Sequence, residues 1–346
     1  MRLPLSAVRE GEDAESRNQG GALLEAVSLT RHFRIGGLFG RMLHAVDDVD
    51  LTLNAREIVA LVGESGSGKS TVARLFAMVF RPTAGDIRFR GRSLSKIRSR
   101  RDILAYRGQV PMVFQDPFSS LNPVHTIGYA LDRGLKLHRP SLSRGEREAE
   151  AVRVLDSVEL SPGRRMLGRY PHELSGGQRQ RVGFARALSC HPRVVLADEP
   201  VSMLDVSIRI GLLNLMAQLC EMEGLSFLYI THDIASARYV AHRVVVMYAG
   251  QVVERGPTEE VLHRPVHPYT RLLLSAVPDP RAELNITSTD LGEPPRVVEP
   301  GEGCRFRWRC PLAVSICAQL TPKLRPASPG HDGACHVTVG QTRPAA

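Results

Sequence analysis

The chain lacks any run of about 18 or more consecutive apolar residues, the least that a membrane-spanning helix needs. Its first residues, MRLPLSAVREGEDAESRNQGG, contain no apolar core of the kind found in a secretory signal peptide. We therefore expect a chain without a membrane span that remains in the cytosol. With 43% hydrophobic and 23% charged residues among 346, the composition also excludes a fibre or a chain that is disordered overall.

Acidic residues are fewer than basic ones, and the formal net charge at pH 7 is +9. Such a balance suits nucleic acid or an anionic membrane face as a partner, but arginine-rich sequences from GC-rich genomes show the same balance. Charge alone therefore identifies no partner.

Short apolar runs alternate with helical patterns from residue 22 to 256, which predicts an α/β domain with a largely parallel sheet. The expected strands include Leu51–Leu53, Ile58–Val62, Val194–Ala197, Phe227–Ile230 and Val244–Tyr248. The expected helices include Ser70–Val79, Arg147–Val158, Gly177–Ser189, Ile208–Glu223 and Ile234–Ala241. Residues from about 116 to 181 lack clear strand signals, so we expect an inserted helical subdomain there. The polar residues 1–21 should form a disordered arm, and residues 257–346, rich in Pro, His and Cys, a small C-terminal appendage.

The string GESGSGKST follows an expected strand and opens an expected helix, as a phosphate-binding P-loop requires. Its glycines allow successive backbone amides to converge on phosphate oxygens, and the helix N-terminus adds a favourable partial charge. Lys69 supplies a full positive charge to the outer phosphates, and Ser70 offers a hydroxyl to Mg²⁺. The candidate ATP-binding residues of this loop are Gly63, Ser65, Gly66, Ser67, Gly68, Lys69, Ser70 and Thr71.

Asp198 and Glu199 follow the apolar run Val194–Ala197, at the strand end where ligands of parallel sheets bind. Asp198 suits a partner of Mg²⁺, and Glu199 suits a general base that polarises the attacking water. Two acids after a strand also fit an ordinary exposed loop. In a chain that carries a P-loop, the pair instead predicts ATP hydrolysis.

The string LSGGQRQR resembles the signature motif, LSGGQ, of the ABC ATPase family. A serine hydroxyl and two glycine amides at a helix start suit an anion. The resemblance implies that the signature faces the γ-phosphate bound to another subunit's P-loop, so that two ATPase domains share each site. It also implies a P-loop ABC ATPase fold, with a mostly parallel core sheet, an antiparallel β part and an inserted helical subdomain. The signature residues are Ser175, Gly176, Gly177 and Gln178.

Further strings match the same family in order, and each implies a role. Gln115 in VFQDP resembles the Q-loop glutamine, which contacts Mg²⁺ and the water. Asp205 in SMLD resembles the aspartate that communicates across the dimer, although Met203 stands where the family usually has alanine. His232 in ITHD resembles the switch histidine that contacts the γ-phosphate, and Phe33 is the candidate for stacking on adenine, with a core or loop aromatic as the alternative. The candidate catalytic residues are then Lys69, Glu199 and His232, and the candidate Mg²⁺ ligands Ser70, Gln115 and Asp198.

The string HPYT, followed by an apolar helix, resembles the tail of ATPases that serve dipeptide, oligopeptide and nickel importers. The resemblance continues through GESGSGKST, FQDPFSSLNP, RYPHELSGGQRQR, DEPVSMLDVS and GCRFRWRCP, and the insertion GGLFG looks more like the second ATPase of such a pair than the first. It implies ATP-driven import of di- and oligopeptides at the cytoplasmic face of the inner membrane. The implied partners are a second ATPase subunit, two membrane permeases and an extracytoplasmic peptide-binding protein, with no nucleic acid.

Two alternatives to peptide import stay open on the sequence. One is an importer ATPase for nickel or another small solute, since the same tail occurs there. The other is a soluble ABC ATPase of DNA repair or translation, which usually carries two cassettes or a long coiled coil. Here one cassette is followed by an importer-like tail, which favours transport.

Four of the six cysteines fall within the last 43 residues, with five, six and seventeen residues between them. A reducing cytosol disfavours disulfides, and this spacing differs from the CxxC pairs of most zinc ribbons. Cysteine ligation of an iron–sulfur cluster tolerates irregular spacing, and related importer ATPases carry similar tail cysteines. A [4Fe-4S] cluster is therefore a candidate cofactor, with zinc or no metal as alternatives. The candidate ligands are Cys304, Cys310, Cys317 and Cys335.

Overall fold

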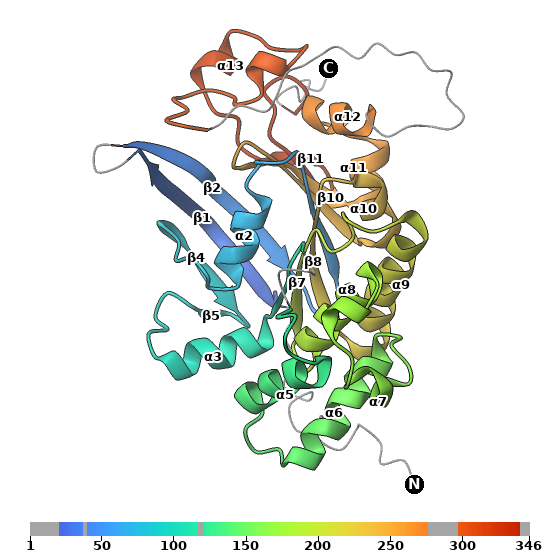
Figure 1. Ribbon diagram of the computed structural model, residues 1–346. Helices are drawn as coiled ribbons and strands as arrows, with labels where there is room; N and C mark the ends of the chain where they lie inside the picture. The colour runs from blue at the N-terminus through green and yellow to red at the C-terminus, as the bar shows by residue number, and fades with distance from the viewer. Residues whose placement is uncertain (1–20, 37–39, 117–120, 276–296, 340–346) are drawn as a thin grey trace.

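The computed structural model describes residues 21–36, 40–116, 121–275 and 297–339. Most of the expected N-terminal arm and the centre of the GGLFG insertion lie outside these residues. Two sheets and a group of helices form the body of the molecule (Figure 1).

The larger sheet has eight strands in the order β11-β12-β10-β9-β3-β8-β7-β6. Neighbours from β9 to β6 pair in parallel, whereas β10, β12 and β11 continue the sheet with antiparallel pairs. The predicted α/β fold with a mostly parallel core sheet is thereby confirmed. The strands are β3 (Ile58–Val62), β6 (Met112–Val113), β7 (Val194–Asp198), β8 (Ser226–Thr231), β9 (Arg243–Tyr248), β10 (Gln251–Pro257), β11 (Arg325–Ser328) and β12 (His331–Gly333).

The smaller sheet is antiparallel, with the order β2-β1-β4-β5. Its long hairpin extends well beyond the single run, Leu51–Leu53, that the sequence pattern predicts. The rest of the hairpin was missed because its residues alternate between buried and partly exposed positions, interrupted by β-bulges, and form no continuous apolar run. The strands are β1 (Leu24–Ile35), β2 (Arg41–Leu53), β4 (Ala84–Phe89) and β5 (Arg92–Ser93).

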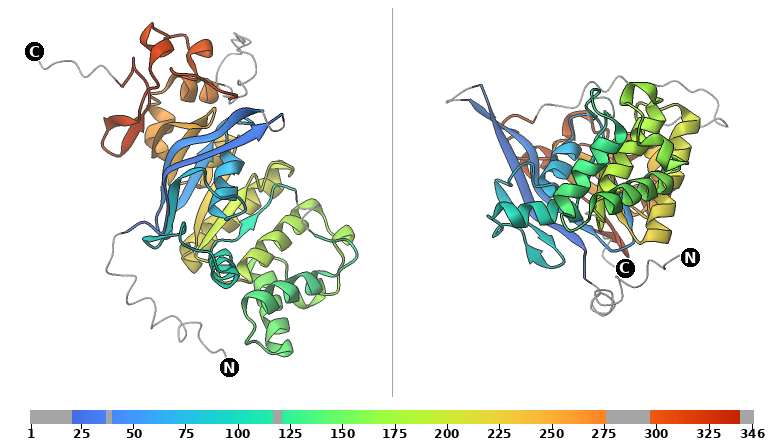
Figure 2. Two further views of the ribbon diagram at one scale, coloured as in Figure 1. Left: turned by 90° about the vertical axis from the view of Figure 1, so that its left-hand side faces the viewer. Right: turned by 60° about the horizontal axis from the view of Figure 1, so that its bottom comes forward.

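The helices surround the larger sheet, and α5, α6 and α7 lie at the end of the molecule opposite α13 (Figures 1 and 2). None of the described helices is both long enough and apolar enough to cross a bilayer. The helices are α2 (Lys69–Phe76), α3 (Arg100–Gln109), α5 (Ile127–His138), α6 (Arg144–Ser157), α7 (Gly163–Met166), α8 (Gly176–Leu188), α9 (Val206–Glu223), α10 (Ile234–Val240), α11 (Thr258–His263), α12 (Pro268–Ser275) and α13 (Ile316–Gln319), with short 3-10 turns η1 (Pro171–Glu173) and η2 (Arg307–Arg309).

Strand β3 shows why the core strands read as continuous apolar runs. All five of its side chains are buried, because alternate residues pack on opposite faces of the sheet. Val59 and Leu61 belong to the core shared with α2 and the smaller sheet, whereas Ile58, Ala60 and Val62 belong to the core under α8 and α9. The P-loop, which follows β3 directly, is thus anchored between two hydrophobic cores.

Helix α2 ends at Phe76 rather than at Val79, so the predicted boundary was wrong. Met78 has a φ of 53°, in the left-handed region, which stops the helix after its cap at Ala77. The apolar spacing beyond Phe76 resembles a helical pattern although the backbone has already turned away.

Candidate functional site

A cavity of about 850 Å³ opens at the carboxyl ends of β3 and β7. Six of the eight predicted P-loop residues and Glu64 meet there with Gln115, Glu199 and His232. The lining residues are Phe33, Ile35, Leu43, His44, Ala45, Glu64, Ser65, Gly66, Gly68, Lys69, Ser70, Thr71, Gln115, Glu199, His232, Leu273, Val297 and Val298. The volume is within the range usual for sites of small ligands.

Two P-loop glycines are required by their backbone. Gly63 and Gly68 have φ values of 152° and 104°, which side-chain-bearing residues rarely adopt. A Cβ at Gly63 would lie 2.2 Å from the Met247 carbonyl oxygen, and one at Gly68 would lie 2.3 Å from that of Ala45. These close approaches let the loop fold back against β9 and β2 before it enters α2.

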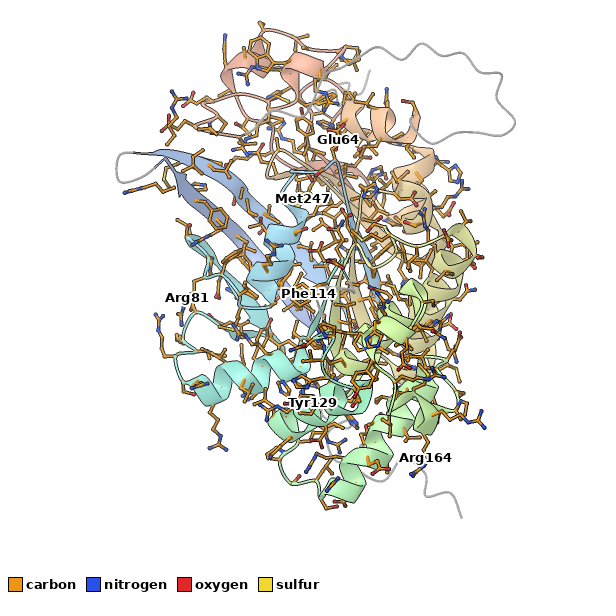
Figure 3. The ribbon with its side chains drawn as sticks, viewed as in Figure 1. Glu64, Arg81, Phe114, Tyr129, Arg164 and Met247 are labelled. Atoms are coloured by element: carbon orange, nitrogen blue, oxygen red, sulfur yellow. The ribbon has the colours of Figure 1, made fainter. Side chains whose placement is uncertain are left out.

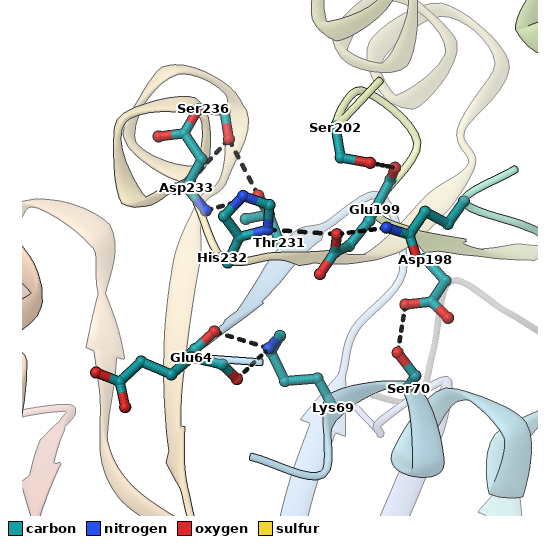
Figure 4. Close-up of polar contacts among 12 residues, drawn as sticks. Glu64, Lys69, Ser70, Asp198, Glu199, Ser202, Thr231, His232, Asp233 and Ser236 are labelled. Carbon is teal, nitrogen blue, oxygen red and sulfur yellow. Dashed lines mark hydrogen bonds and ion pairs between the residues drawn. The ribbon is translucent and has the colours of Figure 1, made fainter. Parts of the chain in front are cut away.

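Lys69 is buried at the first turn of α2, and its ammonium group is held by the loop itself. It donates to the carbonyl oxygens of Gly63 at 2.7 Å and Glu64 at 2.8 Å (Figure 4). Burial lowers the pKa of Lys69, while the nearby carboxylates of Glu199 and Asp198 act in the opposite direction. The lysine is therefore a desolvated positive charge beside the cavity, which is what a phosphate group requires.

The Ser70 hydroxyl donates to a carboxylate oxygen of Asp198 at 2.8 Å (Figure 4). Burial raises the pKa of Asp198, although the hydrogen bond from Ser70 opposes the rise. A nearby cation stabilises a carboxylate that is poorly solvated and bonded only to a neutral hydroxyl. The pair thus offers two hard oxygen ligands of the kind Mg²⁺ prefers.

Glu199 is at the centre of a second group of contacts in the same cavity. Gln115 donates to its Oε2 at 3.0 Å, and the Nδ1 of His232 lies 3.3 Å from the same atom (Figure 4). Glu199 has a φ of 46°, an uncommon value for a residue with a side chain and of a kind that clusters at functional sites. The structure therefore places Gln115 and His232, which are far from Glu199 in the sequence, beside its carboxylate.

The signature residues do not line this cavity. Ser175 caps α8 by accepting from the amide of Gln178 at 3.3 Å, and Gln178 accepts from the amide of Ser175 at 3.1 Å, a capping box. Gly177 is buried, and a Cβ there would lie 2.5 Å from Ile208 of α9. Ser175, Gln178 and the predicted dimer residue Asp205 are all exposed. These residues form a surface that is separate from the P-loop.

Phe33 lines the cavity from β1 and is partly exposed. Its ring meets Phe80 edge to face at 5.3 Å, and the guanidinium of Arg31 lies 4.5 Å from the ring centroid. Stacking of adenine on Phe33 remains a prediction, and Arg31 competes for one face of the ring.

His32, His44 and Asp47 offer ligand atoms that all lie within 4.8 Å of one another, a spacing that suits a metal ion. However, Arg305 makes an ion pair with the same Asp47 carboxylate, and both histidines hydrogen-bond to it. Although burial raises it, these hydrogen bonds leave the pKa of Asp47 below its ordinary value. The carboxylate is already neutralised by a cation, so the cluster holds the C-terminal region against β2.

The four C-terminal cysteines lie in one small region without regular sheet or long helices. The amide of Cys304 donates to the carbonyl of Cys317 at 2.8 Å, which joins the two ends of the segment that contains Cys310. Burial raises the pKa of Cys304 to about 11, and Cys317, Cys310 and Cys335 each add to the rise through charge. Among the described residues, however, no three cysteine sulfurs lie within 4.8 Å of one another.

Sequence reasoning missed the contribution of the C-terminal region to this cavity. Leu273, Val297 and Val298 line it, and Tyr269 and Arg309 hydrogen-bond to Glu64 of the P-loop. HPYT and GCRFRWRCP carry a family resemblance, but neither string predicts a contact with the P-loop. Nothing in the spacing along the chain relates them to a loop about 200 residues earlier.

Comparison with known proteins gives two family matches. Residues 46–202 match the family described as ABC transporter, and residues 253–317 match the family described as the C-terminal region of oligopeptide and dipeptide transporters. A probable peptide ABC transporter ATP-binding protein of Sinorhizobium fredii is 44% identical, covering 91% of this chain and 90% of its own. The oligopeptide transport ATP-binding protein AppF of Bacillus subtilis is 41% identical, covering 91% and 97%.

Solved structures give a similar result for the nucleotide-binding part. The dimeric, post-hydrolysis structure of the ATP-binding cassette MJ0796 with ADP and phosphate has a TM-score of 0.61 and 28% identity, covering 68% of this chain and 98% of the cassette. CbiO1 of Clostridium perfringens, part of an ABC transporter complex, has a TM-score of 0.60 and 26% identity, covering 70% and 91%.

Proposed function

Because this chain belongs to the family of ABC transporter ATP-binding proteins, we propose that it is the ATP-hydrolysing subunit that powers import of di- and oligopeptides. The observation that carries this proposal is the joining, in one chain, of an assembled ATPase cavity and a C-terminal region of the oligopeptide-transporter type. Its curated relatives from Sinorhizobium and Bacillus are named for peptide transport.

ATP is held by the P-loop in this proposal. The amides of the loop and the ammonium of Lys69 bind the phosphates, and Phe33 stacks on the base. Ser70, Asp198 and Gln115 would hold Mg²⁺, which supplies neutralisation of charge on the outer phosphates. The Ser70 hydroxyl, now 2.8 Å from Asp198, would turn its oxygen toward the ion.

Hydrolysis requires a water molecule aligned on the γ-phosphate. Glu199 is suited to take a proton from that water, since its carboxylate faces the cavity and is fixed by Gln115 and His232. The side chain of His232 is 56% exposed, and it would contact the γ-phosphate when nucleotide is bound. The backbone of Glu199 donates to the Ile230 carbonyl at 2.9 Å, which ties the base to β8.

The signature motif completes the site of another subunit. Ser175 and Gln178 at the start of α8 are exposed, and helix N-termini favour anions. The cassette MJ0796 is dimeric with ADP and phosphate, which supports the same arrangement here. We infer a dimer of ATPase subunits in which Asp205 lies near the interface, and the GGLFG insertion favours a different, related chain as the partner.

The remaining partners follow from the transport role. Two membrane permeases would receive the mechanical work, and an extracytoplasmic peptide-binding protein would deliver the peptide to them. The chain would then lie at the cytoplasmic face of the inner membrane. A deletion strain tests this role directly: uptake of labelled di- and oligopeptides should fall, and unchanged uptake of every peptide would contradict it.

A [4Fe-4S] cluster is the cofactor we propose for the C-terminal cysteines. A single zinc ion at about 2.3 Å from each sulfur would draw the four sulfurs to within about 4 Å of one another. Ligation of an iron–sulfur cluster by cysteines tolerates irregular spacing along the chain, and Cys317, Cys310 and Cys335 lie near enough to Cys304 to raise its pKa through charge. Anaerobically purified protein should be brown and absorb near 400 nm, whereas colourless protein with stoichiometric zinc would contradict the cluster.

A further inference from the structure

Glu64, the second residue of the P-loop string, is bonded at three points. Its amide donates to the Tyr269 hydroxyl at 2.8 Å, and its carbonyl accepts from the Lys69 ammonium at 2.8 Å. Its carboxylate accepts two hydrogen bonds from Arg309, at 2.7 and 2.9 Å. Figure 4 shows the carboxylate pointing away from Lys69, so the two ends of Glu64 face different parts of the molecule.

Tyr269 and Arg309, the two partners of Glu64 that lie outside the P-loop, both come from the C-terminal region. Tyr269 is fully buried in α12, and Arg309 ends the turn η2 between two of the cysteines. Figure 3 shows Glu64 at the side of the larger sheet that faces this region. Glu64 therefore joins the P-loop to the C-terminal region.

The Arg309–Glu64 pair has a geometry that makes such contacts strong. Two parallel N–H···O bonds join a planar guanidinium to a carboxylate, and the side chains are only 10% and 25% exposed. The hydrogen bonds to Glu64 raise the pKa of Arg309 further above its ordinary value, despite burial. Removing one partner would leave the other as an unpaired charge with little solvent around it.

Tyr269 belongs to a rigid aromatic group. Its ring lies 4.6 Å from that of Tyr248 and 5.5 Å from that of Phe306, measured between centroids. Burial raises its pKa, so the hydroxyl is neutral at physiological pH and accepts the Glu64 amide. The acceptor is fixed by packing, which fixes the path of the P-loop backbone in turn.

The same region also lines the cavity beside the β1–β2 hairpin. The amide of His44 donates to the Val297 carbonyl at 2.8 Å, and Val298 pairs with Leu43 of β2. Leu273, Val297 and Val298 then lie on the cavity wall. The nucleotide cavity is thus built jointly by the ATPase domain and the C-terminal region.

We propose that Arg309 and Tyr269 are positioning residues for nucleotide binding, which act by holding Glu64 and, through its carbonyl, Lys69. The C-terminal region then sets the affinity of the P-loop for Mg-ATP. The proposal rests on ATP binding, as proposed above, and adds that binding depends on a contact between two distant regions of the chain.

The test is a comparison of Mg-nucleotide dissociation constants, measured with a fluorescent ATP analogue on the full chain. Arg309→Gln should raise the dissociation constant about tenfold, a typical size for coupling between two sites. In a Glu64→Gln background the same change should have less than about a twofold effect, because two neutral amides replace the ion pair and leave no unpaired charge. Arg307→Gln is the matched control, since Arg307 lies on the same turn but donates to the Cys304 carbonyl. It should leave the affinity unchanged.

Thermal unfolding of each variant separates loss of fold from loss of binding. If Arg309→Gln is unfolded, Arg309→Lys keeps the charge, loses the paired geometry and should still raise the dissociation constant several-fold. Tyr269→Phe, which leaves the Glu64 amide without its acceptor, should act in the same direction. A folded Arg309→Gln variant, or failing that Arg309→Lys, with wild-type affinity would overturn the proposal. So would an equal loss in the Glu64→Gln background. Wild-type chain that binds no Mg-nucleotide at all would instead refute the proposed function.

Discussion

We propose that two elements of the chain bind phosphate, and they differ in how far groups of the same chain surround them. The P-loop is enclosed by groups from the same chain, with Lys69 buried and Glu199 fixed by two side chains. In the signature, Ser175 and Gln178 are exposed, and the Ser175 side chain caps its own helix. One element lies in an assembled cavity, while the other lies on an exposed surface. We propose that each belongs to a different ATP site.

The largest effect expected on the P-loop side is that of Glu199→Gln. Loss of the general base should slow hydrolysis about 10²- to 10⁴-fold. Mg-ATP affinity should stay close to that of the wild type, since the amide keeps the shape of the carboxylate and Gln115 and His232 remain. Steady-state phosphate release and nucleotide binding together measure both parts, and wild-type turnover would contradict the role.

A second change tests binding itself. Lys69→Ala removes the buried charge beside the cavity and should weaken Mg-ATP binding by about 10- to 100-fold, as expected for a hydrogen bond between charged groups. Lys136→Ala, on the exposed face of α5, removes the same charge elsewhere and should change nothing. Equal affinities for Lys69→Ala and the wild type would show that the loop does not hold the phosphates.

Two matched variants separate the proposed ATP contact of Ser175 from its role as a helix cap. Ser175→Ala and Ser143→Ala each remove the serine of a capping box and should each cost about 1 kcal/mol of stability. Only Ser175→Ala should also lower hydrolysis, by about tenfold, without changing the affinity of the separate chain for nucleotide. If both variants lose hydrolysis equally, the effect of Ser175 is one of stability alone.

The smallest expected effect concerns Asp198, whose pKa is raised by burial. A raised pKa means that the protonated form stabilises the fold at low pH, and that this contribution is lost as pH rises through the folded pKa, above the ordinary 3.8. At neutral pH without nucleotide, Asp198→Asn should therefore unfold at the same or a slightly higher temperature than the wild type. Added Mg-ATP should stabilise the wild type and not the variant. A large drop in the unfolding temperature of the nucleotide-free variant would contradict this sign.

Local motifs let the sequence predict the core of the site. The P-loop, Asp198 and Glu199 each depend on a few consecutive residues after a buried strand, so their geometry follows from strand and helix signals. Gln115 and His232 come from separate strings, and only family resemblance predicted that they would meet in this cavity. The predicted end of α2 is wrong because the left-handed backbone at Met78 does not change the pattern of apolar residues.

The contacts of the C-terminal region could not be predicted in the same way. Glu64 and Arg309 are 245 residues apart. The sequence contains many other acidic and basic residues with which each of them could pair. The half-buried hairpin β1–β2 likewise carries only a weak pattern, although it brings Phe33 to the cavity and pairs with Val298. Such contacts depend on tertiary packing, which no local spacing encodes.

The central claim is that one chain holds halves of two ATP sites. The most direct measurement is specific ATPase activity per chain over a wide range of concentration of the purified wild-type chain. The account predicts that specific activity rises with concentration, and that Ser175→Ala lowers the activity reached at high concentration. A specific activity that is substantial and independent of concentration would show that a single chain contains a complete site, and would contradict the account.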